Sequence, residues 1–376
     1  MSKITVLGAG MVGRAMALDL AKKYQVTSFD INKENLNILS QSSNIKTQLT
    51  DLSQPENIKK AIADSDLVIN AVPGFMGFKT TKAVIEAGKN IVDISFFPED
   101  SLQLAELAES NNVIAIVDCG VAPGMGNIIL GHHNATMQVE SYECYVGGLP
   151  FRRTLPFQYK APFSPIDVIE EYIRPARYIK DGKIITMPAL SEPELLEFKE
   201  IGTLEAFNTD GLRSLLYTIK IPNMIEKTIR YPGHIEYVKM LRAAGFFCEK
   251  EIKVKGTSIK PIDLTAQLLI DKWKLEKNEP EFTIMRIIIK GKEESKSVTW
   301  QYDLFDRFNE KTGISSMART TGYAATSAVE LILNGDFHRK GINPPEFIGA
   351  EKGCLEKMLN YQKERGVIYN VSNYVA

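Results

Sequence analysis

The first 120 residues alternate between short hydrophobic runs and longer amphipathic stretches. The hydrophobic runs predict six β-strands, at Ile4–Leu7, Val26–Phe29, Thr47–Leu49, Leu67–Ala71, Ile91–Ile94 and Val113–Val117. The stretches between them carry apolar residues three and four positions apart, which predicts helices at Arg14–Lys23, Glu56–Ala63, Phe78–Ala87 and Leu102–Ser110. Strands that alternate with helices are joined by crossovers and form a parallel sheet buried on both faces. We therefore predict a Rossmann-type, doubly wound α/β domain at residues 1–125.

The pattern changes after residue 120. Val121–Asn134 is rich in Gly and Asn and predicts a hinge into a second domain. Helices are expected at Ile235–Ala244 and Pro261–Lys272. Longer strands are expected at Tyr142–Val146, Phe282–Ile289 and Ser297–Phe305, and the last two form a hairpin with a turn longer than two residues. These features predict a mixed α+β domain at residues 126–315. Ser316–Leu333 has the pattern of a long helix, so we expect residues 316–345 to return to the first domain, followed by a C-terminal segment at 346–376.

Composition narrows the class of protein. The chain of 376 residues has 45 Lys and Arg against 46 Asp and Glu. This near-neutral balance argues against binding to nucleic acid, which needs a basic surface. No apolar run approaches the ~18 residues of a membrane span. The four cysteines form no CxxC pair, and His132 and His133 are adjacent rather than spaced as ligands, so no metal is expected. We predict a cytoplasmic protein without nucleic-acid or membrane partners.

A glycine motif follows the first predicted strand directly. Gly8, Gly10 and Gly13 have the G-x-G-x-x-G spacing of a dinucleotide-binding turn, with Met11 and Val12 between the last two glycines. Gly8 allows the tight turn, Gly10 lets the backbone approach a pyrophosphate, and Gly13 lets helix and strand pack closely. The N-terminus of the following helix offers unpaired N–H groups to the phosphates. The motif therefore predicts a dinucleotide cofactor.

Residues at the ends of other predicted strands complete this cofactor site. Asp30 ends the second strand, where a carboxylate binds the ribose hydroxyls of adenosine. A 2′-phosphate about 4 Å from it would be repelled by roughly 4 kcal/mol at an effective dielectric of 20. No Arg follows Asp30, and Lys33 is the nearest cation in the sequence, so NAD is favoured over NADP. Asp51 is expected at the adenine, and the turn after the fourth strand at the nicotinamide ribose; the remaining cofactor residues are Ala71, Val72, Pro73 and Ser95.

Polar residues of the second domain are grouped in short blocks. One block holds Tyr159 and Lys160, a second runs from Glu205 to Arg213, and a third runs from Lys227 to Glu236. Taken singly, such a block is more often a solvated surface or a turn than a substrate contact.

Together the blocks resemble the saccharopine dehydrogenase family, and most closely its lysine 6-dehydrogenase branch. The resemblance covers nearly the whole chain: GAGMVG at the start, DCGVAPG, GGLP, YK, IEEYIRPAR, EAFNTDGLR, KTIRYPGH, and MARTTGY near the end. Phe163 stands where relatives tend to carry Trp. Ala122 stands where saccharopine-forming relatives carry an acid, a difference that favours the lysine branch.

The resemblance implies an NAD(P)-dependent oxidoreductase acting on CH–NH2 or CH–NH groups, and most specifically oxidative deamination of the side-chain amine of L-lysine. Deprotonating an ammonium of pKa ≈ 10.4 near pH 7.4 costs about 4 kcal/mol, so the site needs a base. Lys160, His234 and Asp118 are the candidates for proton transfer. We assign Arg230 to the substrate carboxylate, because a guanidinium binds it through two parallel hydrogen bonds. Asp210 and Glu205 are assigned to its ammonium groups, and the other expected substrate residues are Tyr159, Thr209 and Arg213.

Two other functions fit the same residues. An enzyme that makes or cleaves a secondary amine, such as saccharopine or a carboxylated polyamine, needs a second arginine from Arg152, Arg153, Arg177 or Arg213. A protein that binds the dinucleotide as a sensor, without turnover, has no need of the polar blocks. The apolar hairpin Phe282–Phe305 suits either a sheet-mediated dimer or a sheet covered within one subunit, and the resemblance favours a homodimer.

Overall fold

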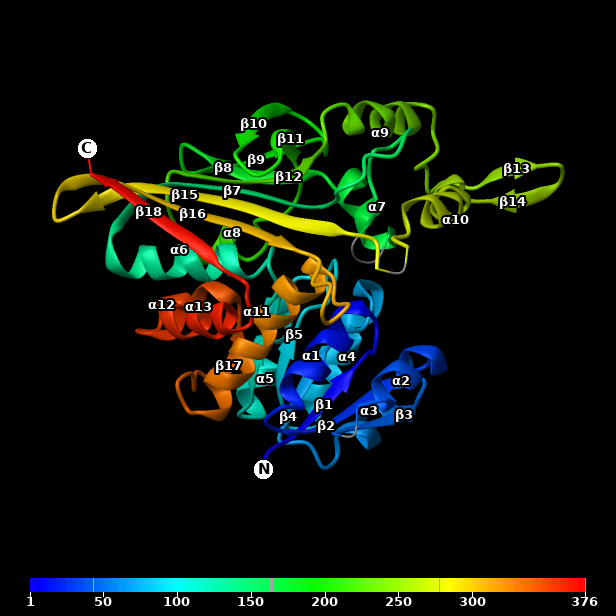
Figure 1. The fold of residues 1–376 in the computed structure, drawn as a ribbon, viewed down its shortest axis with the longest axis vertical. Coiled ribbons are helices and arrows are strands. Elements are labelled where there is room, and N and C mark those ends of the chain that lie inside the picture. Colours follow the sequence, from blue (N-terminus) through cyan, green and yellow to red (C-terminus); the bar gives the residue numbers. More distant parts are fainter. Residues whose placement is uncertain (43, 162–164, 277, 376) are drawn as a thin grey trace. The chain divides into compact units, whose positions relative to one another are not determined.

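The computed structural model describes residues 1–42, 44–161, 165–276 and 278–375, so Phe163 lies outside the described residues. The chain forms two compact units (Figure 1). Unit 1 contains Met1–Gln138 and Met317–Tyr369, and unit 2 contains Val139–Ser316 together with the chain from Asn370. The expected boundary at residue 125 and the expected hinge at Val121–Asn134 therefore fall inside unit 1. The reason is a helix, α6 (Met125–Thr136), whose Gly131 lies so close to Glu346 that a Cβ there would collide with the Glu346 backbone.

Unit 1 is built on a seven-stranded parallel sheet in the order β17-β6-β5-β4-β1-β2-β3. All six strands predicted for the first domain are present, and the Rossmann-type order confirms the fold class. The seventh strand, β17, is three residues long and joins from the C-terminal part of the chain. The strands are β1 (Lys3–Leu7), β2 (Gln25–Asp30), β3 (Ile45–Leu49), β4 (Leu67–Asn70), β5 (Asn90–Asp93), β6 (Ile114–Ile116) and β17 (Gly341–Asn343).

Helices connect and cover these strands. The sequence pattern missed α2, a short helix with only Leu36 and Leu39 buried, which Asn32 caps by accepting from the N–H groups of Glu34 and Asn35. The helices of unit 1 besides α6 are α1 (Met11–Leu20), α2 (Lys33–Ser40), α3 (Pro55–Ile62), α4 (Gly74–Glu86), α5 (Ala105–Ser110) after a 3-10 turn at Ser101–Leu104, α11 (Ser316–Leu333), α12 (Pro345–Ala350) and α13 (Cys354–Glu364).

A buried carboxylate joins three of these helices. Asp19 of α1 accepts from Thr326 Oγ1 of α11 at 3.0 Å and from Tyr361 of α13 at 2.7 Å. Arg365, directly after α13, donates from Nε to both Asp19 oxygens at 2.8 Å. Because the Asp19 side chain is 1% exposed, this paired charge ties the late helices to the glycine-turn helix.

Unit 2 contains a mixed nine-stranded sheet, which confirms the α+β class expected for the second half. Its main path is β10-β11-β12-β7-β15-β16-β18, with β8 pairing to β12 and β9. The sequence patterns missed β8 to β12. The strands are β7 (Gln138–Pro150), β8 (Ala176–Lys180), β9 (Lys183–Met187), β10 (Glu194–Phe198), β11 (Gly202–Asn208), β12 (Asn223–Arg230), β15 (Glu281–Glu293), β16 (Lys296–Arg307) and β18 (Tyr369–Val375), with a separate hairpin of β13 (Ile252–Val254) and β14 (Thr257–Ile259).

The long hairpin of unit 2 corrects one expectation. β15 and β16 pair from Phe282↔Arg307 to Glu293↔Lys296, so the turn has two residues, not more. Glu294 and Ser295 adopt φ of 47° and 69°, the conformation of a type I′ turn, which matches the twist of the strands. Charged residues around Gly291 suggested a longer loop, but they lie on the paired strands.

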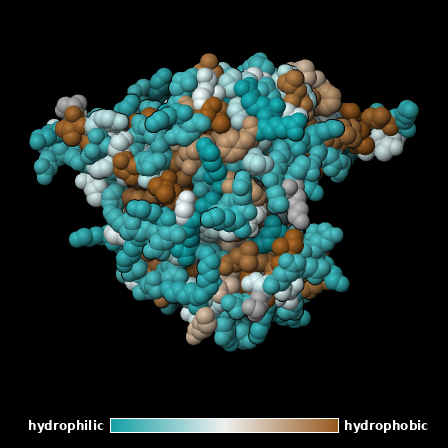
Figure 2. Space-filling model, viewed as in Figure 1, coloured by the Kyte–Doolittle hydropathy of each residue, from teal (hydrophilic) through white to brown (hydrophobic). Residues whose placement is uncertain are grey.

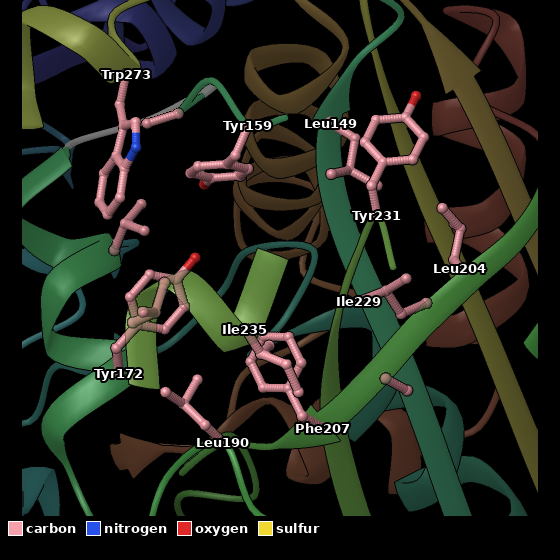
Figure 3. Close-up of a cluster of buried hydrophobic side chains, with 14 of the residues drawn as sticks. Leu149, Tyr159, Tyr172, Leu190, Leu204, Phe207, Ile229, Tyr231, Ile235 and Trp273 are labelled. Atoms are coloured by element: carbon pink, nitrogen blue, oxygen red, sulfur yellow. The ribbon is translucent and has the colours of Figure 1, made fainter. Parts of the chain in front are cut away.

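The helices of unit 2 accompany a large aromatic core. They are α7 (Pro165–Ile173), α8 (Leu215–Thr218), α9 (His234–Ala243) and α10 (Pro261–Trp273). The core includes Phe207, Tyr231 and Trp273, and Figure 3 shows part of it around Tyr159 and Tyr172. Phe282 and Ile284 of the β15–β16 hairpin belong to this core, and Ile288 and Phe305 pack against it.

The surface carries scattered apolar groups on a mostly hydrophilic face (Figure 2). Among the described residues, no helix combines the length and the apolar character that crossing a bilayer requires.

Candidate functional site

The glycine turn of unit 1 has the geometry that its spacing predicts. Gly8 adopts φ +102°, and a Cβ there would lie 2.5 Å from the Ala71 carbonyl oxygen. A Cβ at Gly13 would collide with the backbone of Gly8. At Gly10, by contrast, a Cβ would meet no protein atom within 4 Å. Gly8 and Gly13 are therefore required by the protein itself, whereas Gly10 leaves the open approach that a pyrophosphate needs.

The residues after Gly10 place a helix N-terminus beside this turn. Helix α1 begins at Met11 and continues through Val12, so its first N–H groups point out of the turn. Asp30, at the end of β2, accepts from Ala9 N at 2.6 Å and from Asn32 N at 2.7 Å. The Asp30 carboxylate is thus held directly against the glycine turn, and it is only partly buried.

A cavity of about 340 Å³ lies at the ends of β2 and β3. Asp51 is part of its wall and is fixed by Ser53, whose side-chain and backbone hydrogen bonds lower the pKa of Asp51. The cavity lies entirely within unit 1, on the adenosine side of a Rossmann-type sheet. Its lining residues are Phe29, Gln48, Leu49, Thr50, Asp51, Asn57, Lys60 and Ala61.

A polar cluster that the sequence analysis missed lies at the ends of β4 and β5. Asn70 and Asp93 are cross-strand partners, and Asn70 Nδ2 donates to Asp93 Oδ1 at 2.7 Å. Ser95 donates to the same oxygen at 2.5 Å. Burial raises the pKa of Asp93 to about 8, against the Ser95 hydrogen bonds and with a further increase from Asp118. Among the expected cofactor residues, Ser95 therefore donates to a carboxyl whose pKa is raised by burial.

The other expected residues of unit 1 flank this cluster. Ala71, Val72 and Pro73 follow β4 directly, and Val72 N donates to Asn70 Oδ1 at 3.4 Å. Asp118 follows β6, is 5% exposed and adopts φ +52°. These residues all lie at the carboxyl ends of parallel strands, where open α/β sheets bind their ligands.

In unit 2, Arg230 ends β12 as an almost fully buried cation, 2% exposed. It donates to the Tyr172 hydroxyl at 3.0 Å, to the Ile229 carbonyl at 2.9 Å and to Glu171 at 2.9 Å. Its guanidinium also lies 4.4 Å from the centre of the Tyr159 ring, in cation–π geometry. Three of its five N–H groups are thus used by these partners.

His234, the first residue of α9, is bound from both sides. Its Nδ1 lies 2.8 Å from the Phe157 carbonyl oxygen, which can only accept, so Nδ1 carries the hydrogen. Its Nε2 therefore accepts from the Tyr172 hydroxyl at 2.9 Å. Burial, followed by the charge of Arg230, lowers the pKa of His234 to about 3. The imidazole is neutral, and the Tyr172 hydroxyl connects it to Arg230.

Aromatic rings enclose this array. Figure 3 shows Tyr159, Tyr172 and Trp273 grouped together, with ring centres of Tyr159 and Trp273 5.6 Å apart. The Tyr159 hydroxyl and the Trp273 indole N–H are buried without a hydrogen-bond partner among the described residues. Such groups cost free energy unless a partner satisfies them.

Three other expected substrate residues each have a different hydrogen-bond partner. Glu205 is the cross-strand partner of Arg230 and accepts from Gly233 N at 3.0 Å. Thr209 pairs with Thr228 at 2.8 Å. Asp210 forms two 2.8 Å hydrogen bonds with Arg177, so that pair is already neutral.

Lys160 and Arg213 complete the expected residues of unit 2. Lys160 donates to the Lys274 carbonyl at 3.1 Å and lies 3.5 Å from Glu279. Arg213 adopts φ +52° in the segment before α8.

The relationship to known proteins follows from two family models. Residues 4–116 match a saccharopine dehydrogenase NADP binding domain, and residues 118–367 match a saccharopine dehydrogenase C-terminal domain. The chain belongs to the saccharopine dehydrogenase family. The resemblance inferred from the short motifs is thereby confirmed at the level of the family. The N-terminal match, together with the glycine turn, also supports a nicotinamide cofactor.

Individual members of the saccharopine dehydrogenase family are distant in sequence. The chain is 22% identical over 452 aligned positions to mitochondrial alpha-aminoadipic semialdehyde synthase of Mus musculus, covering 99% of this chain and 48% of the mouse protein. It is 26% identical over 255 positions to saccharopine dehydrogenase [NADP(+), L-glutamate-forming] of Saccharomyces cerevisiae, covering 63% of this chain and 57% of the yeast protein. The chain thus spans about half the length of the mouse relative.

A solved structure supports the fold of this family member. Apo histidine-tagged saccharopine dehydrogenase (L-Glu forming) from Saccharomyces cerevisiae superposes with a TM-score of 0.80 at 20% identity, covering both chains completely.

Several residues of the site escaped the sequence analysis of this family member. Glu171 and Tyr172 lie in the IEEYIRPAR block, which was used as a motif but not assigned a role. Asp93 is an acidic residue inside the hydrophobic run Ile91–Ile94, the one local signal that could have identified it.

Proposed function

We propose that the chain is an NAD-dependent oxidoreductase that deaminates the side-chain amine of L-lysine. The observation that carries the proposal is the arrangement around Arg230, a buried cation with Glu171 bonded to it and Glu205 opposite it in the sheet. A buried guanidinium complements the α-carboxylate of an amino acid, and the carboxylate of Glu205, whose backbone pairs with that of Arg230, is proposed for the α-ammonium. The two remaining N–H groups of Arg230 would bind the substrate carboxylate.

Bound NAD would accept a hydride from the carbon that bears the amine, and water would convert the resulting imine to an aldehyde and ammonium. The chain must first remove a proton from the substrate ammonium, at a cost of about 4 kcal/mol near pH 7.4. Asp118 and the neutral amine form of Lys160 are the proposed proton acceptors. His234 is the weaker candidate, because its Nε2 lone pair is occupied by the Tyr172 hydroxyl. We assign His234 to holding Tyr172 and Arg230 in place.

The choice between NAD and NADP rests on opposing observations. The N-terminal family model and the yeast relative are both named for NADP. Asp30, however, places a carboxylate against the glycine turn, where a 2′-phosphate would be repelled. The residue after it is Ile31, which is 70% exposed and carries no charge. We propose NAD on this basis.

The second candidate function is the oxidation or formation of saccharopine, which the names of the relatives favour. Saccharopine carries more carboxylates than lysine and needs a second cation. Arg177 is bonded to Asp210 through both nitrogens, and Arg153 donates to Gln158 and stacks on Tyr231. Two of the four arginines considered for that role therefore already have polar or ring partners.

One assay separates these functions. Purified chain is mixed with NAD or NADP and with lysine, saccharopine or a carboxylated polyamine, and reduced cofactor is followed at 340 nm. Reduction with lysine supports the proposal, and reduction with saccharopine alone supports the second candidate. Cofactor binding without reduction by any amine would favour a sensor.

Assembly as a cytoplasmic homodimer is also part of the proposal. The apolar hairpin residues invoked for it are largely buried, so the stronger feature is β18, which ends the sheet. Tyr374 and Val375 of this uncharged strand are 61% and 64% exposed. Exposed edge strands without charges pair readily with another chain, and a second copy offers the same edge. Light scattering of the wild-type chain and of Val371→Lys would show a dimer that the substitution dissociates.

A further inference from the structure

Asp93 is the most deeply buried carboxyl near the expected cofactor site, and its two oxygens differ. Oδ1 accepts from Asn70 and Ser95, whereas Oδ2 is buried without a partner among the described residues. A buried carboxylate with one unpaired oxygen is costly, and a protonated carboxyl is far less so.

The contacts of Asp93 lead to the turns that bind the cofactor. Asn70, which donates to Asp93, accepts from Val72 N, and Val72 belongs to the turn whose carbonyl at Ala71 lies against Gly8. Ser95, which also donates to Asp93, lies against Gly77 of α4 so closely that any Cβ there would collide with it. A single side chain thus holds the turn after β4 and the segment after β5.

We propose that Asp93 is a positioning residue for the nicotinamide end of the cofactor, acting as a neutral carboxyl that fixes Asn70 and Ser95. The inference deepens the proposed function and rests on its cofactor site. Asp93 touches neither substrate nor reacting atoms in this role. Its effect reaches the cofactor through the backbone turn at Val72.

The charged and titratable groups around Asp93 agree with a neutral side chain at this position. Asp118, which follows β6, contributes a negative charge that opposes ionisation of Asp93. Burial, followed by the charges of Asp93 and Asp118, raises the pKa of the Cys119 thiol well above the ordinary range. On β4 and α4, the groups that contact Asp93 are the amide of Asn70 and the hydroxyl of Thr81, which are not titratable.

Two substitutions at Asp93 distinguish a neutral carboxyl from a charged one. Asp93→Asn keeps the shape and one acceptor oxygen of a protonated carboxyl, and Asp93→Ala removes both. Asp64→Asn, an exposed carboxylate of unit 1, is the matched control. The dissociation constant of NADH, or of NADPH if the wild type prefers it, is measured by fluorescence titration at pH 7 and pH 9. Circular dichroism verifies the fold of each variant.

We expect Asp93→Ala to weaken binding by about ten-fold or more at pH 7, and Asp93→Asn to stay within about three-fold of wild type. At pH 9 wild type should bind more weakly than at pH 7, because Asp93 ionises, while Asp93→Asn should change less. A folded Asp93→Ala that binds like wild type would overturn the proposal, as would a folded Asp93→Asn that binds as poorly as Asp93→Ala. A wild-type chain that binds neither dinucleotide would overturn it too. If the chain binds the dinucleotide but does not oxidise lysine, the role proposed for Asp93 would stand and only the proposed deamination would be refuted.

Discussion

The hydroxyl of Tyr172 accepts from Nε of Arg230 at 3.0 Å and donates to Nε2 of His234 at 2.9 Å. It therefore serves a buried cation and a buried neutral imidazole with the two hydrogen-bonding capacities of one oxygen. Removing it leaves both partners unsatisfied in the core of unit 2.

Tyr172→Phe should lower the free energy of unfolding by about 1–3 kcal/mol, because a buried donor on Arg230 and a buried acceptor on His234 lose their partner. Urea denaturation measures the change. Tyr178→Phe is the control, since the Tyr178 hydroxyl makes an exposed 3.4 Å contact with Glu192, and it should change stability by less than about 0.5 kcal/mol. Equal stability of the two variants would refute the bridging role.

Arg230→Ala should raise KM for lysine by about ten-fold or more, because the substrate carboxylate loses a charge-assisted hydrogen bond. Steady-state kinetics at saturating cofactor measure it, with circular dichroism to confirm folding. Arg230→Lys keeps the charge but not the planar guanidinium, so it should recover only part of the loss. An unchanged KM in a folded Arg230→Ala chain would remove the assignment.

Asp30→Ala should weaken the use of NAD and improve the use of NADP. The ratio of kcat/KM with NADP to kcat/KM with NAD should rise by at least about ten-fold. The carboxylate both binds the ribose hydroxyls and repels a 2′-phosphate, so its removal acts on the two cofactors in opposite directions. Initial rates with each cofactor give the ratio. A wild-type chain that already prefers NADP would contradict the role given to Asp30.

The buried imidazole of His234 should make the fold sensitive to acid. Burial lowers the pKa of His234 to about 3, below its unfolded value near 6.5. Between these values the unfolded chain binds more protons, so stability is present above pH 6.5 and is lost as pH falls toward 3, by up to about 1.4 kcal/mol per pH unit. Denaturation curves from pH 7 to pH 5 measure this slope. His234→Gln should be less stable at pH 7 yet have a shallower slope, and parallel slopes would exclude His234 as the cause.

Much of the first unit could be predicted because its signals are local. Gly8, for example, is required by its own positive φ and by the close approach of the Ala71 carbonyl. The alternation of short apolar runs with amphipathic stretches indicated six parallel strands without any knowledge of their partners. The second unit was harder, since β12 pairs with β7 and β8 across long separations and the burial patterns of β8 and β9 alternate only in part.

The candidate site contains contacts that local sequence signals could not predict. The sequence presented Asp210 as a free carboxylate for an ammonium, and only the fold brings Arg177 to it with two 2.8 Å hydrogen bonds. Arg230 and His234, by contrast, were placed in one block, because only three residues separate them at the junction of β12 and α9.

By itself, the sequence determined the alternating α/β layout, the glycine turn with Asp30, and the family, because periodicity, backbone sterics and short motifs are carried by residues close together in the chain. The tertiary structure decided which charges are already paired, that Tyr172 bridges Arg230 and His234, and that Asp93 lies beside Asn70. Those outcomes depend on strand register and long-range packing, which set the distance between two side chains and the amount of water left around them.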